Sequence, residues 1–259
     1  MQRFVAIQGI DRSVVLASQA FTALIPLLIL VAALAPAGSE AEVSQVLIRR
    51  LGLTGEGAEA VETLFDIPDA AAGGVSVFSA LLLLASGTSF ARRLQKMYLA
   101  AWDEEKVGVR SGLYAAAGLL VLMLEIAVLY AARSLVHQLP ASWALTLPVS
   151  LVAGAVLWTS IPHVLLNRRL SWRRMLFGGV VAAVGTTTYS LVTSLYMPSL
   201  VNSYTEQFGL FGITLALIGW LLVIAGVIVV SAVVGAEFDQ SDDPWARALK
   251  TRLAHGSRG

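Results

Sequence analysis

The sequence predicts an all-α, polytopic membrane protein with six transmembrane helices and amphipathic interfacial helices in the first outer loop and the C-terminal tail. Of its 259 residues, 57% are apolar and 14% are charged, and the mean hydropathy is +0.75. These values are untypical of a soluble domain. The apolar residues also gather in runs of about 20, the helix length that crosses a bilayer. Helices are expected because a lipid-facing backbone must satisfy its own hydrogen bonds.

Six apolar runs are the candidate spans. They comprise residues 14–34, 75–91, 112–135, 143–166, 175–198 and 211–234. The second is the shortest, so its helix is expected to extend into the flanking residues. The first run, which is followed by Ala35-Pro36-Ala37, also resembles a signal peptide with a cleavage site. Its length and the interruptions at Gln19 and Pro26 favour a retained span instead.

The distribution of positive charge predicts the orientation of the chain. Fifteen of the eighteen Lys and Arg residues fall in the N-terminus, the second and fourth loops and the tail, whereas the first loop carries seven acidic residues. Under the positive-inside rule, both termini are expected in the cytoplasm. We expect a single transmembrane domain, residues 1–237, followed by a cytoplasmic amphipathic and basic tail, residues 238–259.

The first outer loop has the pattern of two short amphipathic helices. Ser39 and Glu42 have the spacing of a capping box, in which each side chain satisfies a backbone N–H group at a helix start. Apolar residues then fall on one face, and a second run repeats the pattern before Pro68 ends it. These helices are expected on the outer membrane surface or over the bundle. A solvated loop is the alternative.

Two cytoplasmic segments are expected to contact lipid. In the tail, Asp243 is a candidate cap before Pro244, and apolar residues then recur every four positions. In the second loop, aromatic residues alternate with Arg92, Arg93 and Lys96. Basic and aromatic residues together can bind RNA, but Trp and Tyr also settle at headgroup depth, where cations meet anionic lipid. We therefore expect membrane lipids, and no nucleic acid, as partners.

Four motifs lie in order along nearly the full chain. They are Ala17-Ser-Gln-Ala-Phe-Thr-Ala-Leu-Ile-Pro26, Ser86-Gly-Thr-Ser-Phe-Ala-Arg-Arg-Leu-Gln-Lys-Met-Tyr98 with Trp102, Arg168-Arg-Leu-Ser-Trp-Arg-Arg-Met-Leu-Phe-Gly-Gly179, and Phe208-Gly-Leu-Phe-Gly212 through Trp220 to Gly235-Ala-Glu237. In these motifs the chain resembles the YihY/BrkB family of bacterial inner-membrane proteins, members of which have carried the label ribonuclease BN. The resemblance implies six spans, a place in the bacterial inner (plasma) membrane and a role in envelope integrity. It implies no shared molecular activity.

Glu125, near the middle of the third run, is the strongest local sign of a functional site. No Lys or Arg lies within a helical turn of it, and a charge at mid-bilayer costs on the order of 3 kcal/mol on insertion scales. Two interpretations stay open. Glu125 is either a proton- or cation-linked site facing the bundle interior, or a carboxylic acid kept neutral by burial and hydrogen-bonded to a neighbouring helix.

Small polar residues of other spans are the candidate partners of Glu125 in an intramembrane polar site. They are Ser18, Gln19 and Thr22 in the first span, Ser86 in the second and Thr187 in the fifth. Residues of this kind more often mediate close helix packing and interhelical hydrogen bonds. A structural role is therefore the alternative to a transport path.

A second candidate cluster lies at the expected cytoplasmic boundary. Glu237 follows the sixth span at about the level of Arg92, Arg93, Arg168 and Arg169. We expect Glu237 to pair with one of these arginines and to fix the inner end of the bundle. The arginines could instead bind lipid phosphate through forked hydrogen bonds, or act only as a topology signal.

The sequence offers little support for catalysis. The absence of Cys excludes thiolate chemistry and thiolate metal sites, and His137, His163 and His255 are dispersed along the chain. The common hydrolase and phosphate-binding motifs do not occur. We expect no enzyme activity, no catalytic residue, no metal and no cofactor, and ribonuclease activity is disfavoured.

The leading functional interpretation is a transporter or flippase of a lipid-related or small amphipathic substrate that supports envelope integrity. Six spans can divide into two inverted repeats of three, as in many transporters, although no internal repeat is evident. The alternative is a noncatalytic scaffold or assembly factor whose outer loop engages envelope proteins. A membrane-embedded enzyme is a third interpretation, and the formation of a homo-oligomer stays open.

Overall fold

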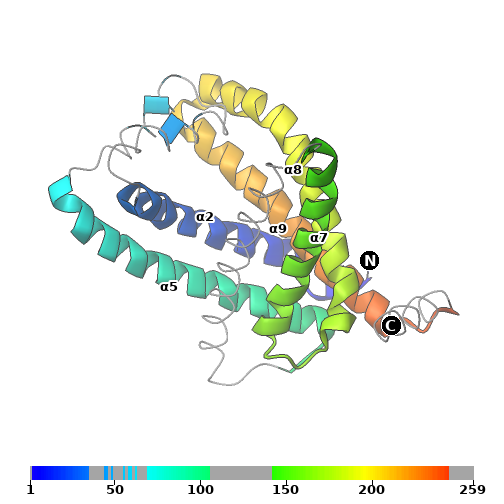
Figure 1. Ribbon diagram of the computed structural model, residues 1–259. Helices are drawn as coiled ribbons and strands as arrows, with labels where there is room; N and C mark the ends of the chain where they lie inside the picture. Colours follow the sequence, from blue (N-terminus) through cyan, green and yellow to red (C-terminus); the bar gives the residue numbers. More distant parts are fainter. Residues whose placement is uncertain are drawn as a thin grey trace. The chain divides into compact units, whose positions relative to one another are not determined.

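In the computed structural model, all regular secondary structure of the described residues is helical (Figure 1). The described residues are 2–34, 44–45, 48, 55, 58–59, 62, 69–105 and 142–244. The helices are α1 (Gln2–Ala6), α2 (Gly9–Leu34), α5 (Asp69–Trp102), α7 (Ser142–Leu165), α8 (Trp172–Phe208) and α9 (Leu210–Gln240). The all-α class is confirmed for these residues. The expected third span, residues 112–135, lies outside them.

Among the described residues, four helical stretches are long and apolar enough to cross a membrane. They are Val77–Trp102, Pro148–Leu165, Trp172–Thr193 and Phe211–Gln240, and they match the second, fourth, fifth and sixth expected spans. Large apolar side chains on these stretches are exposed, with Val77 at 63% and Phe211 at 72%. Exposed apolar surface of this kind suits lipid better than water.

The ends of two helices differ from the expected spans. The first expected span lies within α2, which begins earlier, at Gly9. The fifth expected span ends at Pro198, but α8 continues through this proline to Phe208, because membrane helices tolerate an internal proline. Gly209 then ends α8 in the left-handed conformation (φ +59°), and its N–H donates to the Thr205 carbonyl at 2.8 Å.

The chain forms two compact units, which are described separately. Unit 1 comprises Met1–Ser13, Ala91–Thr188 and Gly226–Gly259, and unit 2 comprises Val14–Phe90 and Tyr189–Ala225. The helices α2, α5, α8 and α9 each contribute residues to both units. Unit 1 combines close glycine contacts with large buried side chains such as Met97, Leu166 and Met175, and unit 2 has an apolar cluster of its own.

In unit 1, α8 and α9 meet at Gly178 and Gly235. A Cβ atom added at Gly235 would lie 2.7 Å from the Cα of Gly178, and one added at Gly178 would lie 3.2 Å from the Cα of Gly235. The indole of Trp102 packs on both glycines. Its Cη2 would lie 3.4 Å from a Cβ atom at Gly235 and 3.7 Å from a Cβ atom at Gly178. Close approach of small residues is the usual way in which helices associate in lipid, where burial of apolar surface supplies no driving force.

In unit 2, one residue of the first outer loop packs on the long helices. Ile48 is buried in a cluster with Met197 and Val201 of α8 and Ala216 of α9. Within the same loop, Gln45 Nε2 donates to the Glu62 carboxylate at 3.0 Å. This part of the loop therefore covers helices of unit 2, one of the two arrangements expected from the sequence. The predicted capping box and the predicted apolar face of the loop lie outside the described residues.

The Gly178–Gly235 contact predicts a large difference between two glycine substitutions on α9. Gly235→Ala is expected to lower the free energy of unfolding by about 1–3 kcal/mol, because the added methyl group must push two backbones apart. Gly226→Ala is the matched control, since a Cβ there meets nothing within 4 Å and alanine favours a helix by about 1 kcal/mol over glycine. Unfolding of the detergent-solubilised protein measures both. Equal stability of the two variants would contradict the contact.

Candidate functional site

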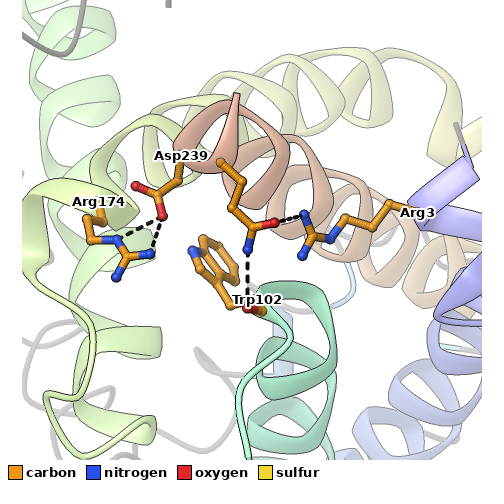
Figure 2. A network of polar contacts seen from close by, with 5 residues as sticks. Arg3, Trp102, Arg174 and Asp239 are labelled. Atoms are coloured by element: carbon orange, nitrogen blue, oxygen red, sulfur yellow. Dashed lines mark hydrogen bonds and ion pairs between the residues drawn. The ribbon is translucent and has the colours of Figure 1, made fainter. Parts of the chain in front are cut away.

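The last two residues of α9 join three other segments of unit 1 (Figure 2). Arg174 of α8 donates to Asp239 Oδ2 from Nη2 at 2.6 Å and from Nε at 2.8 Å. Gln240 accepts from Arg3 Nη1 of α1 at 2.6 Å and donates to the Trp102 carbonyl at the end of α5 at 3.3 Å. These five residues, Arg3, Trp102, Arg174, Asp239 and Gln240, are called the terminal network below.

The terminal network lies at the ends of the membrane-spanning stretches. Trp102 is the last residue of Val77–Trp102, Arg174 lies in the first turn of Trp172–Thr193, and Asp239 and Gln240 end Phe211–Gln240. The Trp102 side chain is 3% exposed, and its Nε1–H has no hydrogen-bond acceptor among the described residues. A buried donor without an acceptor is costly, so this indole is the exception within an otherwise paired cluster.

A second polar group lies in unit 2, near the end of the membrane-spanning stretch Trp172–Thr193 of α8 and just beyond it. The hydroxyl of Tyr189 lies 3.3 Å from that of Tyr196 and 3.5 Å from the Trp220 carbonyl of α9. Thr193 lies between the two tyrosines in sequence, and its buried Oγ1 lies beside the Tyr189 hydroxyl without the geometry of a regular hydrogen bond to any described residue. Tyr189, Thr193 and Tyr196 are called the hydroxyl cluster below.

The arginines of the predicted boundary cluster are exposed, two inside α5 and two in a turn between helices. Arg92 and Arg93 are on the surface of α5, and Arg168 and Arg169 are in the turn between α7 and α8. In that turn Asn167 and Arg168 adopt φ values of 54° and 57°. Arg169 Nη1 donates to the Glu105 carbonyl at 3.2 Å.

The carboxylate that pairs with an arginine at this end of α9 is that of another residue than Glu237. Glu237 is exposed, and the described residues show no ion pair between it and Arg92, Arg93, Arg168 or Arg169. The ion pair at this helix end joins Arg174 to Asp239. A helix turns about 100° per residue, so residues 237 and 239 point in nearly opposite directions. The ion pair that the structure shows at this helix end therefore joins residues other than those named from the sequence.

Among the described residues, the predicted intramembrane polar side chains form no hydrogen bond from one helix to another. Glu125 lies outside the described residues. Thr22 and Ser86 donate their hydroxyl protons to carbonyls of their own helices, those of Ser18 at 2.9 Å and Leu82 at 2.7 Å. Ser18 is exposed, and Gln19 and Thr187 are half-buried. Within the described residues the two hydroxyl groups therefore satisfy themselves locally.

The terminal network and the hydroxyl cluster contain residues that sequence reasoning missed. Tyr189 and Tyr196 are seven residues apart, a spacing that places two side chains on one helix face. Arg174 precedes Gly178 by four residues, and Asp239 follows Gly235 by four, so each charged residue lies one turn from the glycine of its own helix. These spacings were available in the sequence, but the partners of each residue were not.

Residues that could ligate a metal are scattered in the part of the chain that the structure describes. No three His, Asp or Glu side chains there are grouped closely enough to hold one ion. His163 lies at the end of α7, where its Nδ1 is 2.9 Å from the Leu170 carbonyl. This contact ties the ring to the turn before α8.

Long apolar helices with exposed apolar side chains, and polar networks at their ends, define a multi-pass helical membrane protein. The sequence model of the family described as "Virulence factor BrkB" matches residues 1–253, and the chain belongs to this family. The resemblance read from the four sequence motifs is thereby confirmed. No curated protein and no solved structure matches the chain.

The Arg174–Asp239 pair predicts different effects for two carboxylates on the same helix. Asp239→Asn is expected to lower the free energy of unfolding by about 0.2–1 kcal/mol, because the side chain of Arg174 is 46% exposed and the pair is partly screened. Glu237→Gln, the matched control, is expected to leave stability unchanged. Thermal unfolding at low and high salt measures both, and the effect of Asp239→Asn should shrink at high salt. A greater loss for Glu237→Gln would reverse this assignment.

Proposed function

We propose that the protein is a six-span inner-membrane transporter or flippase. It handles a lipid-related or small amphipathic substrate and thereby supports envelope integrity. In this proposal the protein is not an enzyme, requires no cofactor, has membrane lipids as partners and has its N- and C-termini in the cytoplasm. Membership of the BrkB family and the four apolar helical stretches support a membrane role. The substrate-handling role rests on the hydroxyl cluster.

The hydroxyl cluster supports a path for a polar group because its hydrogen-bonding capacity is incompletely used. Elsewhere in the apolar helices, hydroxyl groups donate to a carbonyl one turn back, as Thr159 does to Ala155 at 2.6 Å. Thr193 makes no such bond within the described residues. The two contacts of the Tyr189 hydroxyl, at 3.3 Å and 3.5 Å, are longer than the usual 2.5–3.0 Å of such bonds. Unmet polar groups are expensive in hydrocarbon, and a passing polar headgroup would satisfy them.

The proposed orientation is supported by the arginines in the turn between α7 and α8. Arg168 and Arg169 lie in the exposed turn between α7 and α8, and under the positive-inside rule this turn belongs in the cytoplasm. Reporter enzymes fused into the turn and at the C-terminus are expected to show cytoplasmic activity only, and a reporter in the first loop is expected to show periplasmic activity only. Periplasmic activity at the α7–α8 turn would contradict this orientation.

The second candidate function is a noncatalytic scaffold or assembly factor. It is favoured by the burial of Ile48 against α8 and α9, which gives the first loop a defined place on unit 2 from which to present a surface to an envelope protein. A scaffold, however, has no need of unmet hydroxyl groups inside the membrane. Transport and scaffolding therefore differ in their dependence on the hydroxyl cluster.

Reconstituted flux separates the two functions. In vesicles containing the full chain, Tyr189→Phe is expected to slow the movement of a fluorescent phospholipid between leaflets roughly two- to tenfold, the effect of one lost hydrogen bond to the substrate. Tyr204→Phe is the matched control, because Tyr204 is on the same helix in the same unit and contacts Phe208 edge to face, with the ring centroids 6.4 Å apart.

Glu125→Gln belongs in the same series, since a proton- or cation-linked carboxylate would make the rate depend on that substitution. Phospholipid movement that is absent from the native protein, or equal in native protein and Tyr189→Phe, would exclude the transport role of the hydroxyl cluster and leave the scaffold.

A further inference from the structure

The buried indole of Trp102 is placed beside Arg174 and Asp239 by helix geometry. Its ring packs on Gly178 and Gly235. Arg174 lies one turn before Gly178 on α8, and Asp239 lies one turn after Gly235 on α9. Figure 2 shows the indole nitrogen on the side of the Arg174–Asp239 pair. An indole N–H is a donor only, so a partner for it must bring an acceptor oxygen.

The guanidinium of Arg174, at the same helix end, has N–H groups on Nη1 that are not used in its contact with Asp239. Both of its contacts to Asp239, from Nε and Nη2, go to the single oxygen Oδ2, and the described residues offer no acceptor to Nη1. Its side chain is 46% exposed, whereas that of Asp239 is 10% exposed. The guanidinium can therefore receive a further anion from outside, and its planar fork matches two oxygens of one phosphate group.

The position of these residues in the membrane indicates which kind of anion they would bind. Trp102, Arg174 and Asp239 lie at the ends of three membrane-spanning stretches, the level at which lipid phosphates meet a protein and at which Trp is favoured. Asp239 is the internal anion that occupies part of Arg174, and the charge of Glu104 also acts on this guanidinium. A phosphate would share Arg174 with Asp239 or replace it, and would supply the oxygen that Trp102 lacks.

We propose that Trp102 and Arg174 form a binding site for a phosphate group, with Asp239 as its internal competitor. This inference deepens the proposed function, on which it rests, because the site would receive the headgroup of the substrate at one end of the protein. The site binds phosphate as an anion held by two donors of different kinds, and no bond to phosphorus is made or broken.

The Trp102 indole proton reports directly on the ligand. Full-length protein labelled with ¹⁵N-tryptophan in a phosphate-free nonionic detergent is titrated with dioctanoyl phosphatidylglycerol, and with dioctanoylglycerol, which lacks the phosphate. The indole N–H resonance that disappears in Trp102→Phe is expected to move downfield with the phospholipid only. If none of the six indole N–H resonances of the native protein moves at saturating phospholipid, the proposal is overturned, and this outcome does not depend on the folding of Trp102→Phe.

Three variants test the electrostatic part of the site. Arg174→Gln is expected to weaken phospholipid binding about tenfold or more, the effect of losing one charge-assisted hydrogen bond. Arg49→Gln removes the same charge from the first outer loop, which the proposed orientation puts on the other side of the membrane, and is expected to leave binding unchanged. Asp239→Asn is expected to strengthen binding although it lowers stability, a combination that a purely structural role would not produce. Equal weakening by Arg174→Gln and Arg49→Gln would reduce the site to general surface charge and refute it.

Inorganic phosphate distinguishes the source of the ligand. If the Trp102 resonance moves with phosphatidylglycerol and ignores millimolar inorganic phosphate, the site binds a lipid headgroup. If it moves with inorganic phosphate at lower concentration than with the lipid, the site binds a soluble phosphate. Binding is measured at equilibrium without transport. Loss of binding with intact phospholipid flux would therefore refute this inference alone, whereas binding without flux would refute only the proposed transport.

Discussion

The contact between Gly178 and Gly235 is the constraint on which the described polar chemistry of unit 1 depends. Because neither residue has a side chain, α8 and α9 approach closely enough for one indole, that of Trp102, to cover both. One helical turn from these glycines, the same close approach places Arg174 Nη2 2.6 Å from Asp239 Oδ2. Gln240, the next residue of α9, is hydrogen-bonded to Arg3 and to the Trp102 carbonyl. The terminal network is thus a consequence of backbone packing, and its charged residues do not hold the helices together by themselves.

A second constraint is that the hydrocarbon of the membrane contains no water, so polar groups there must find their hydrogen-bond partners within the protein. It accounts for most of the small polar residues of the apolar helices, since Thr22, Ser86, Thr159 and Ser231 each donate to a carbonyl of their own helix. Such groups add little to a transport path. The informative residues are those that break this pattern, Thr193 in unit 2 and Trp102 in unit 1, and the two functional proposals follow from them.

Composition and the spacing of apolar residues were enough to predict the helical class and the four spans that the structure describes, because hydrophobic length is a property of the chain alone. The sequence could not say which carboxylate pairs with an arginine, because that depends on rotation about the helix axis. Glu237 and Asp239 are equally good candidates by depth, and only the packing of Gly235 on Gly178 turns Asp239 toward Arg174. Similarly, α8 continues past Pro198 to Phe208, which neighbouring helices permit and local propensity does not.

The two unusual polar sites share a pair of helices. Arg174 and Tyr189 belong to α8, and Asp239 and Trp220 belong to α9, so each site combines a donor side chain of α8 with an acceptor group of α9. A charged donor is stable at a solvated helix end, whereas neutral donors cost less where a helix is surrounded by hydrocarbon. On α8 the charged donor Arg174 lies in the first turn, and the neutral donors lie near the end of the membrane-spanning stretch. This separation of charged and neutral donors along one helix is the main physical argument for the proposed substrate-handling role.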